Sequence, residues 1–254
     1  MGHFSHYRPN KFFPYFLTKM AAAGFMLGVI AIYMLIMTGF DLYEFSEGLT
    51  IWFLVLMIYS IICSMLIDLI KLKVKQTNQI FEVLLYIIAG FAPFIFTMVL
   101  PFIIIAGTVG AICAVIYLFA THFVTRNRII KIVLAFVIPI LLLISANIDF
   151  TTKTNWQETR NNTSYAATFD YFNGKHEIPI QVKAGKTITF SVEFIEKNHG
   201  GYGFSMRDDN RDYLGMEEVG DDKFKITAPK DGDYYVEIRG DSLQGRVLVN
   251  WGIE

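Results

Sequence analysis

One uninterrupted apolar stretch constrains this chain more than any other feature of its sequence. Residues 80–123 form a run of 44 positions that is almost wholly apolar, and Glu82 and His122, near its ends, are its two acidic or basic side chains. One membrane crossing needs about 20 apolar residues. The stretch therefore predicts two crossings, joined by a tight turn at Leu100 and Pro101.

Apolar segments on both sides of this hairpin extend the prediction to five transmembrane helices within residues 1–150. The expected spans cover residues 20–40, 49–70, 80–100, 102–123 and 129–148. A cleaved signal peptide is the alternative for the first segment, but its apolar region would be shorter. A four-span alternative treats residues 80–123 as one helix. That helix would be about 65 Å long in a hydrocarbon core of about 30 Å.

The basic residues of the membrane half predict its orientation. All nine lie in three clusters, at the N-terminus, at Lys71–Lys75 and at Arg126–Lys131. Five spans place these three clusters on one side of the membrane. Because cytoplasmic loops carry an excess of Lys and Arg, that side is expected to be the cytoplasm. The N-terminus is then inside, and everything after residue 150 is outside the plasma membrane.

The composition changes after residue 150. Residues 151–254 hold 13 Lys and Arg against 17 Asp and Glu, a net charge of −4. Residues 151–164 are expected to form a polar linker. From there apolar and polar residues alternate, as in residues 187–194, which is typical of half-buried strands. Seven or eight such strands predict an antiparallel β-sandwich or jelly roll over residues 165–254.

Cysteine usage indicates how the C-terminal domain folds. Cys63 and Cys113 both lie in apolar spans, and residues 151–254 contain no cysteine. An exported domain of this kind must fold by its core, without disulfides. This is common among exported bacterial proteins and favours a bacterial plasma membrane.

Three stretches of the C-terminal domain carry a family resemblance. They are IQVKAGKTITFSVEF (Ile180–Phe194), FKITAPKDGDYYVEIRG (Phe224–Gly240) and VLVNWGI (Val247–Ile253). The order of a strand, Ala-Gly-Lys, a second strand, Pro-x-x-Gly-x-Tyr-x-Val and a final strand resembles the bacterial pre-peptidase C-terminal type of β-sandwich. The resemblance implies an accessory module of the kind attached to secreted enzymes. No family is recognised for the membrane half.

One acidic loop offers candidate metal ligands. Asp208, Asn210 and Asp212 are spaced as in a calcium loop. An EF-hand would need Gly at the sixth position and Glu at the twelfth, where this chain has Tyr213 and Val219. The motif therefore fails, and a polar hairpin turn is the favoured interpretation, because Asp and Asn favour turns; a less regular calcium site is the alternative.

Small residues at helical spacing predict close helix packing. Gly24 and Gly28 form a GxxxG motif in the first span, and Ala106, Gly110 and Ala114 recur every four residues in the fourth. Small residues let helix backbones approach closely in lipid. Packing within the chain is favoured over a dimer face.

Three ionisable residues lie near the ends of the expected spans, and charges within a membrane are functional candidates. The favoured interpretation is nevertheless pairing at the cytoplasmic interface with neighbouring basic side chains. The three residues are Asp68, Glu82 and His122, and the expected neighbours are Lys71, Lys75 and Arg126.

No catalytic motif appears in the chain. The H-E-x-x-H, G-x-S-x-G and Walker patterns are missing, and His176 and His199 are expected to be isolated in loops. We therefore expect a protein that is not an enzyme, has no cofactor and binds no nucleic acid. It would display the sandwich as a binding module for another membrane or cell-envelope protein. The alternative is a small transporter or channel subunit with an accessory ectodomain.

Overall fold

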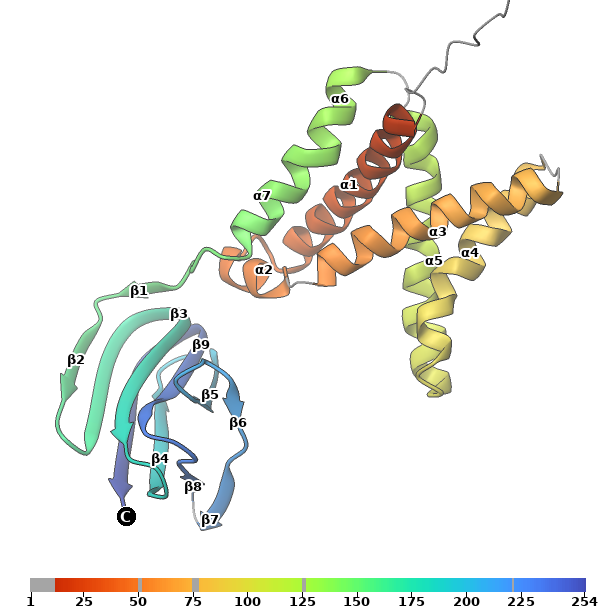
Figure 1. Ribbon diagram of the computed structural model, residues 1–254. Coiled ribbons are helices and arrows are strands. Elements are labelled where there is room, and N and C mark those ends of the chain that lie inside the picture. The colour runs from red at the N-terminus through yellow and green to blue at the C-terminus, as the bar shows by residue number, and fades with distance from the viewer. Residues whose placement is uncertain (1–11, 50–51, 75–77, 125–126, 221) are drawn as a thin grey trace, which may run out of the picture. The chain divides into compact units, whose positions relative to one another are not determined.

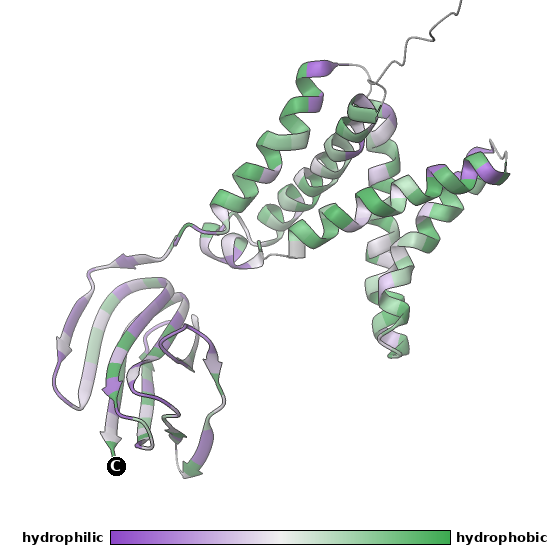
Figure 2. Ribbon diagram, in the orientation of Figure 1, coloured by the Kyte–Doolittle hydropathy of each residue, from purple (hydrophilic) through white to green (hydrophobic). Residues whose placement is uncertain are grey.

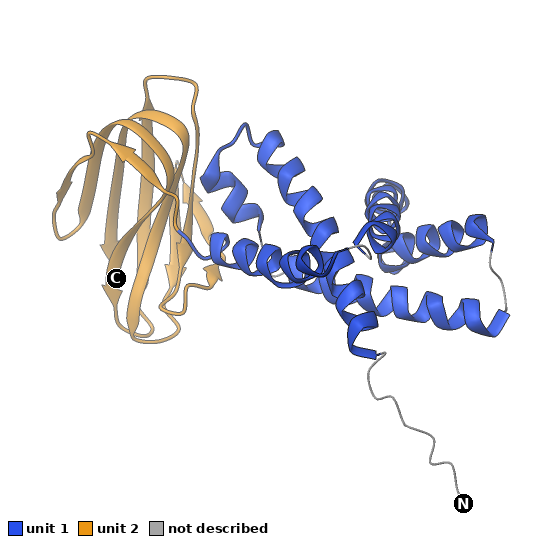
Figure 3. Cartoon of the chain, turned by 90° about the horizontal axis from the view of Figure 1, so that it is seen from above, with its two compact units in different colours: residues 1–148 blue, residues 149–254 orange. Residues whose placement is uncertain are grey.

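The computed structural model describes residues 12–49, 52–74, 78–124, 127–220 and 222–254. The chain divides into two compact units, residues 1–148 and 149–254 (Figure 3). Four basic residues that contribute to the predicted orientation lie outside the described residues: Arg8, Lys11, Lys75 and Arg126.

The first unit is helical and largely apolar (Figures 1 and 2). Among the described residues of this unit, four helical segments are long and apolar enough to cross a membrane, whereas α4, with 17 residues, is apolar but shorter. The structure therefore confirms apolar helices of membrane-spanning length in this unit, but it does not confirm the predicted count of five. The elements are α1 (Phe12–Met37), α2 (Leu42–Gly48), α3 (Trp52–Val74), α4 (Gln79–Ile95), α5 (Leu100–Phe123), α6 (Arg128–Ile132), the π-helical turn η2 (Val133–Val137) and α7 (Ile138–Ser145).

Two predicted boundaries in this unit are wrong. The first span was expected to begin at residue 20, but α1 begins at Phe12, so that Lys19 lies inside the helix. The hairpin turn was expected at Leu100 and Pro101, but it lies at residues 96–99. Pro101 stands in the first turn of α5. Backbone N–H groups in a first turn have no acceptor within the helix, so a proline there costs no helical hydrogen bond.

The short acidic segment between the first two expected spans forms α2, with Asp41 just before it. Asp41 caps this helix, because its Oδ1 accepts the N–H groups of Tyr43 at 2.8 Å and Glu44 at 3.1 Å. Such a cap satisfies donors that a helix start leaves without partners.

Helices α4 and α5 pack side by side in opposite directions. Tyr86 faces Tyr117 with ring centroids 6.1 Å apart, and Phe94 faces Phe102 at the same separation. Between these pairs, a Cβ on Gly90 would lie 2.5 Å from the carbonyl oxygen of Gly110. The absence of a side chain at Gly90 thus allows the two backbones to touch.

The described residues of the second unit form one antiparallel sheet of nine strands, whose main path runs in the order β1-β3-β9-β4-β8-β7. Strand β2 pairs with β3, β5 with β9, and β6 with β5. The strands are β1 (Thr152–Thr154), β2 (Gln157–Arg160), β3 (Ser164–Val182), β4 (Thr187–Glu196), β5 (Gly201–Arg207), β6 (Tyr213–Leu214), β7 (Glu217–Gly220), β8 (Lys223–Thr227) and β9 (Gly232–Ile253).

Strands β3 and β9 are long and bent, with 19 and 22 residues. Their pairing is irregular between Phe169 and Gly174, and Gly174 pairs with Gly240 just beyond this irregularity. A Cβ on Gly240 would lie 2.5 Å from the Phe172 ring, so a side chain there would block the bend. The bend lets one sheet fold over into two layers.

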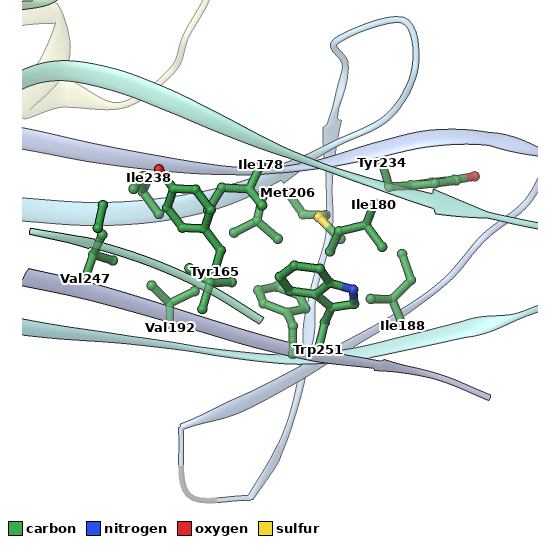
Figure 4. Close-up of a cluster of buried hydrophobic side chains, with 14 of the residues drawn as sticks. Tyr165, Ile178, Ile180, Ile188, Val192, Met206, Tyr234, Ile238, Val247 and Trp251 are labelled. Carbon is green, nitrogen blue, oxygen red and sulfur yellow. The ribbon is translucent and has the colours of Figure 1, made fainter. Parts of the chain in front are cut away.

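A hydrophobic core fills the space between the two layers (Figure 4). Tyr234, Val236 and Ile238 point into it from β9 and are fully buried, and Val247 and Val249 do the same beyond the bend. Polar residues alternate with them on the outside, as the sequence pattern predicts. This arrangement is typical of a β-sandwich.

The prediction that residues 151–164 form a linker is wrong, because these residues form strands β1 and β2. Lys153 of β1 pairs with Phe172 of β3, and Glu158 of β2 pairs with Ala167. All four residues of β2 are exposed. An edge strand with no buried face shows no apolar alternation, which is why the sequence pattern missed it.

Candidate functional site

The outer face of strands β3, β9 and β5 carries the best organised set of polar side chains in the sandwich. The pleat of β9 turns Tyr235, Glu237 and Arg239 outward, and β5 places Arg207 opposite Tyr235. We call this set the arginine–tyrosine surface. Its members are Glu177, Arg207, Arg211, Tyr213, Tyr235, Glu237 and Arg239.

Glu237 is the buried centre of this surface, with 1% of its side chain exposed. Its Oε2 lies 2.7 Å from Arg207 Nε, and its Oε1 accepts a hydrogen bond from Arg239 Nε at 2.7 Å. Burial alone raises the pKa of Glu237, but the hydrogen bonds and charges of Arg239 and Arg207 outweigh it and lower the pKa. The ionised carboxylate therefore fixes both guanidinium groups.

Tyr213 of β6 covers the two arginines from outside. Its hydroxyl oxygen accepts hydrogen bonds from Arg207 Nη2 at 2.5 Å and Arg239 Nη2 at 2.8 Å. Its ring centroid lies 3.8 Å from the Arg207 guanidinium carbon, a cation–π contact. Because 60% of Tyr213 is exposed, the surface presents an aromatic ring held rigidly above two charges.

The loop that offered calcium ligands borders this surface. Asp208 Oδ1 accepts the N–H groups of Asn210 at 2.9 Å and Asp212 at 3.0 Å, and Asp208 Oδ2 lies 3.3 Å from Lys230 Nζ. The backbone hydrogen bond from Asp212 is the main cause that lowers the pKa of Asp208. These contacts fit the favoured hairpin-turn interpretation, and calcium binding stays an untested alternative.

The same loop contributes a cation to the surface. Arg211 pairs with Glu177, and its guanidinium carbon lies 3.8 Å from the Tyr235 ring centroid. The loop therefore adds an arginine to the arginine–tyrosine surface. Within the described ranges, no group of three His, Cys, Asp or Glu side chains is placed to hold a metal ion.

A second polar cluster surrounds His176, which was wrongly expected to be isolated in a loop. His176 lies in β3, where its Nδ1 is 2.8 Å from Lys153 Nζ and its Nε2 is 2.8 Å from the Tyr165 hydroxyl. An ammonium group donates only, so Nδ1 accepts and Nε2 carries the proton. Tyr165 in turn donates to Glu158 Oε2 at 2.7 Å.

This cluster holds β1 and β2 against β3. Trp156 stacks on Phe169 with ring centroids 5.1 Å apart and donates from Nε1 to Glu158 at 2.8 Å. Burial, followed by the positive charge of Lys153, lowers the pKa of His176 to about 4. His176 is therefore neutral at pH 7, as its hydrogen bonds require.

A third cluster lies inside the helical unit. Lys19 of α1 is 7% exposed, and its Nζ lies 2.7 Å from both Asp68 Oδ2 and Ser64 Oγ on α3. Tyr15 donates to the same Asp68 oxygen at 2.7 Å, and Ser64 Oγ lies 2.6 Å from the Tyr86 hydroxyl. A continuous polar chain thus joins α1, α3 and α4.

The ionisable residues singled out in the spans are only partly brought together. Asp68 pairs with Lys19, whereas Lys71 pairs with Glu82 at 2.7 Å. His122 Nδ1 lies 3.0 Å from the carbonyl oxygen of Leu118 in its own helix. Lys19 was missed because it was assigned to the segment before the first span.

The predicted packing glycines lie at contacts within this chain. A Cβ on Gly24 would lie 1.6 Å from the carbonyl oxygen of Leu134 in η2, and one on Gly110 would lie 2.3 Å from that of Gly90. Gly28 is less tightly packed, with Ile138 Cγ2 3.6 Å from such a Cβ. Ala106 is half-buried, and Ala114 packs against the main apolar cluster of the unit.

Comparisons with known proteins leave the family of this chain open. No protein-family model and no curated protein matches it. Among solved structures, a likeness is found to the crystal structure of Aeromonas hydrophila PliG, a periplasmic lysozyme inhibitor of g-type lysozyme. It has 13% sequence identity, a TM-score of 0.27, and covers 42% of this chain and 93% of that chain.

A second likeness is to the crystal structure of accessory secretory protein 1,2 and 3 in Streptococcus pneumoniae. It has 12% identity, a TM-score of 0.25, and covers 41% of this chain and 88% of that chain. Both TM-scores are far below 0.5, so neither likeness indicates a function. The resemblance to the pre-peptidase C-terminal sandwich stays a prediction.

Proposed function

We propose that this chain is a multi-pass plasma-membrane protein, not an enzyme, that presents its C-terminal sandwich outside the cell as a binding module. Five helices cross the bilayer, with the N-terminus in the cytoplasm. The partner is another membrane or cell-envelope protein. Neither a cofactor nor nucleic acid takes part, and the sandwich serves as an accessory module of the pre-peptidase C-terminal type.

The arginine–tyrosine surface carries this proposal. Arg and Tyr are enriched at the centres of protein interfaces and among the residues that dominate binding energy. Glu237 and Tyr213 already fix Arg207 and Arg239, so little side-chain freedom is lost on binding. A buried ion pair adds little net stability compared with apolar packing. The cluster is therefore better suited to recognition than to stability.

The five-span topology depends on α4. Its 17 residues extend about 26 Å, slightly less than a hydrocarbon core of about 30 Å. Its pairing along α5, from Tyr86 to Phe94, supports a crossing together with that longer helix. The turn after it is apolar, with Phe96 85% and Met98 89% exposed, and so can enter the membrane interface.

The second candidate function is a transporter or channel subunit, and the chain of Lys19, Asp68, Ser64 and Tyr86 favours it. Charges inside a membrane unit commonly mark ion or proton paths. However, the groove between α4 and α5, of about 320 Å³, has an apolar lining, and so does the cavity between α1, α3 and α7, which has a volume of about 20 Å³. That volume holds about one water molecule. A binding role is therefore favoured.

Crosslinking in mild detergent tests the proposal. The intact protein should capture a partner that a chain truncated after Asp149 does not. Arg211→Ala should lower the yield several-fold, because it removes an exposed guanidinium from the surface. Arg246→Ala is the matched control, since Arg246 is exposed on β9 beyond the bend. If the intact and truncated chains recover the same proteins and neither migrates above monomer size, the proposal is wrong.

A further inference from the structure

One flank of strand β5 is open over most of its length. Strand β9 pairs with all of β5, from Gly201 to Arg207. On the other flank, β6 pairs with Met206 and Arg207 alone. In the part of the chain that the structure describes, no strand pairs with residues 201–205 on this flank. We call these residues the open edge.

Pro179 reveals which backbone groups of β5 face outward. Pro179 pairs with Tyr235 but has no N–H, and its carbonyl oxygen accepts a hydrogen bond from Arg160 instead. Pro179 and Tyr235 therefore do not exchange hydrogen bonds, and the backbone groups of Tyr235 turn toward β5. Alternation along β5 then turns the N–H and C=O groups of Tyr202 and Phe204 outward, away from β9.

Other free edges of the sheet carry protection that the open edge lacks. Pro179 and Arg160 occupy the outer flank of β3. The free half of β4, beyond Ser191, carries two glutamates, and the short β7 carries two more in an irregular register. Charges, prolines and bulges are the usual means of blocking an edge. Residues 201–205, Gly-Tyr-Gly-Phe-Ser, contain neither a charge nor a proline.

The open edge is complementary to itself. A two-fold axis through Gly203, perpendicular to the sheet, places the β5 strands of two copies antiparallel, with Gly203 of one copy opposite Gly203 of the other. Tyr202 of each copy then lies opposite Phe204 of the other copy. Because the N–H and C=O groups of both residues face outward, each such pair exchanges two hydrogen bonds. All outward backbone groups of Tyr202 and Phe204 thus find partners.

The side chains of the open edge suit the same register. A Cβ on Gly203 would meet no atom within 4 Å, so nothing obstructs the approach of a second strand on the outer face. On the inner face, Tyr202 is 52% exposed and stacks on Phe194 of β4 with ring centroids 4.6 Å apart. In the two-fold register, Phe204 of the other copy covers Tyr202. Aromatic pairs across neighbouring strands stabilise a sheet.

The length of the open edge favours a second copy over an unrelated strand. Strand β6 occupies Met206 and Arg207, so an added strand that ran past residue 205 would meet β6. In the two-fold register, Gly200 of the second copy falls opposite Met206. There the second copy has already left the sheet, because Gly200 lies against the bend of β9, where a Cβ on it would be 2.7 Å from Leu243 Cα. The β5 strand of a second copy therefore stops short of β6.

Charge does not oppose contact between two copies. The outer face of β3, β5 and β9, together with the loop after β5, carries four acidic and four basic side chains, so their charges balance. They are Glu177, Asp233, Glu237 and Asp241 against Lys175, Arg207, Arg211 and Arg239. The dimer contact therefore depends on backbone pairing and aromatic packing, and not on charge.

We propose that two copies of this chain pair through their open edges, which joins their sandwiches into one continuous sheet. The contact is isologous, since the same residues of both copies form it. This inference goes beyond the proposed binding function and does not depend on it, because the contact uses the edge of β5 and not the arginine–tyrosine surface. The two-fold axis places the two arginine–tyrosine surfaces on one face of the joined sheet.

Disulfide crosslinking of the full chain in detergent tests the register. Cys63 and Cys113 are first replaced by alanine, which leaves no other cysteine. Gly203→Cys should then form a disulfide-linked dimer, because opposite residues that share no hydrogen bond have Cα atoms about 4.5 Å apart, within the range of a disulfide. Ser205→Cys is the matched control on the same face. Its two copies would lie about 14 Å apart, so this variant should stay monomeric.

A double variant checks that the strands are antiparallel. Gly201 of one copy lies opposite Ser205 of the other, so a chain with both Gly201→Cys and Ser205→Cys should crosslink, although neither single variant does. Crosslinking of Gly203→Cys that is no faster than that of Ser205→Cys would overturn the inference, because it would show random collision instead of a defined register.

Backbone pairing is tested at Tyr202. Tyr202→Pro removes the outward N–H and the ring, whereas Tyr202→Ala removes the ring alone. Because each dimer of Tyr202→Pro loses two hydrogen bonds, we expect its dissociation constant to rise about a hundredfold more than that of Tyr202→Ala. Light scattering in detergent measures the monomer–dimer equilibrium, and circular dichroism checks that both variants are folded.

Three outcomes of these measurements would contradict the inference. The first is equal dissociation constants of the two Tyr202 variants, and the second is an unmodified chain that stays monomeric at all concentrations. The third is a monomeric chain that captures a different protein and loses it in Tyr202→Pro, because the open edge would then belong to that protein.

Discussion

Lys153 Nζ lies 2.8 Å from His176 Nδ1, although the two residues are 23 positions apart. Because an ammonium group cannot accept a hydrogen bond, this contact requires an imidazole with a free Nδ1 lone pair. The contact therefore links the placement of β1 to the protonation state of a histidine in β3. It also sets where the C-terminal unit must begin in order to be complete.

We predict that residues 149–254 fold alone, because this unit has its own core and no cysteine. A fragment that begins at Trp156 lacks β1 and Lys153, and it should lose about 1–3 kcal/mol of the free energy of unfolding. Urea unfolding followed by circular dichroism measures both fragments. Equal midpoints and slopes would show that β1 adds no stability.

The free energy of unfolding of residues 149–254 should depend on pH through His176. Its folded pKa of about 4 is below the unfolded value of about 6.5, so the unfolded chain binds more protons between these values. Stability is then complete above pH 6.5 and falls as the pH decreases toward 4, by up to about 3 kcal/mol. Urea unfolding at pH 7, 5.5 and 4.5 measures this loss.

Two substitutions test whether His176 causes the loss of stability at low pH. His176→Gln should remove most of the loss between pH 6.5 and 4.5. His199→Gln, in the turn before β5, should keep it. A loss that is unchanged in His176→Gln would attribute the effect to other groups.

Glu237 and Glu177 allow the contribution of a buried ion pair to the free energy of unfolding to be compared with that of an exposed one. Glu237→Gln leaves Arg207 and Arg239 without their buried counter-ion and should lower the free energy of unfolding by about 2–4 kcal/mol. Glu177→Gln affects a pair that is 29% and 47% exposed and should cost less than about 1 kcal/mol. Similar losses for the two variants would mean that Glu237 does not organise the surface.

Gly24 and Gly28 provide a matched pair in the helical unit. Gly24→Ala places a methyl group against the Leu134 backbone and should destabilise the unit, whereas Gly28→Ala makes an ordinary contact with Ile138. Thermal aggregation of the full chain in detergent should begin several degrees lower for Gly24→Ala only. Equal shifts would contradict the close packing of α1 on η2.

The sequence was sufficient for features that repeat with a regular period. Apolar runs predicted the helical half, and alternation predicted the strands around Tyr234 and Ile188. It was insufficient where long-range contacts decide, as in the bend at Gly174 and Gly240 and the exposed strand β2. The sites were missed for the same reason. Glu237 looks like any outward residue of a strand until the register brings Arg207 beside it.

The membrane half shows the same limit. Composition identified the apolar segments. Where a helix begins depends, however, on an N-cap such as Asp41 or on the position of a proline such as Pro101. Lys19 illustrates the consequence, because a shift of eight residues in the start of α1 moves a charge from a tail into a packed helix. Its partner Asp68 is 49 residues away and has no signal in the local sequence.

The location of the sandwich tests the central claim most directly. If α4 and α5 both cross the membrane, as proposed, reporter fusions after Gly48, Thr97 and Glu254 should score as outside, and fusions after Lys73 and Arg128 should score as inside. Agreement at all five positions is the result that five spans predict. A cytoplasmic score after Glu254 would contradict the account, because the sandwich would then face the cytoplasm and could not bind a partner outside the cell.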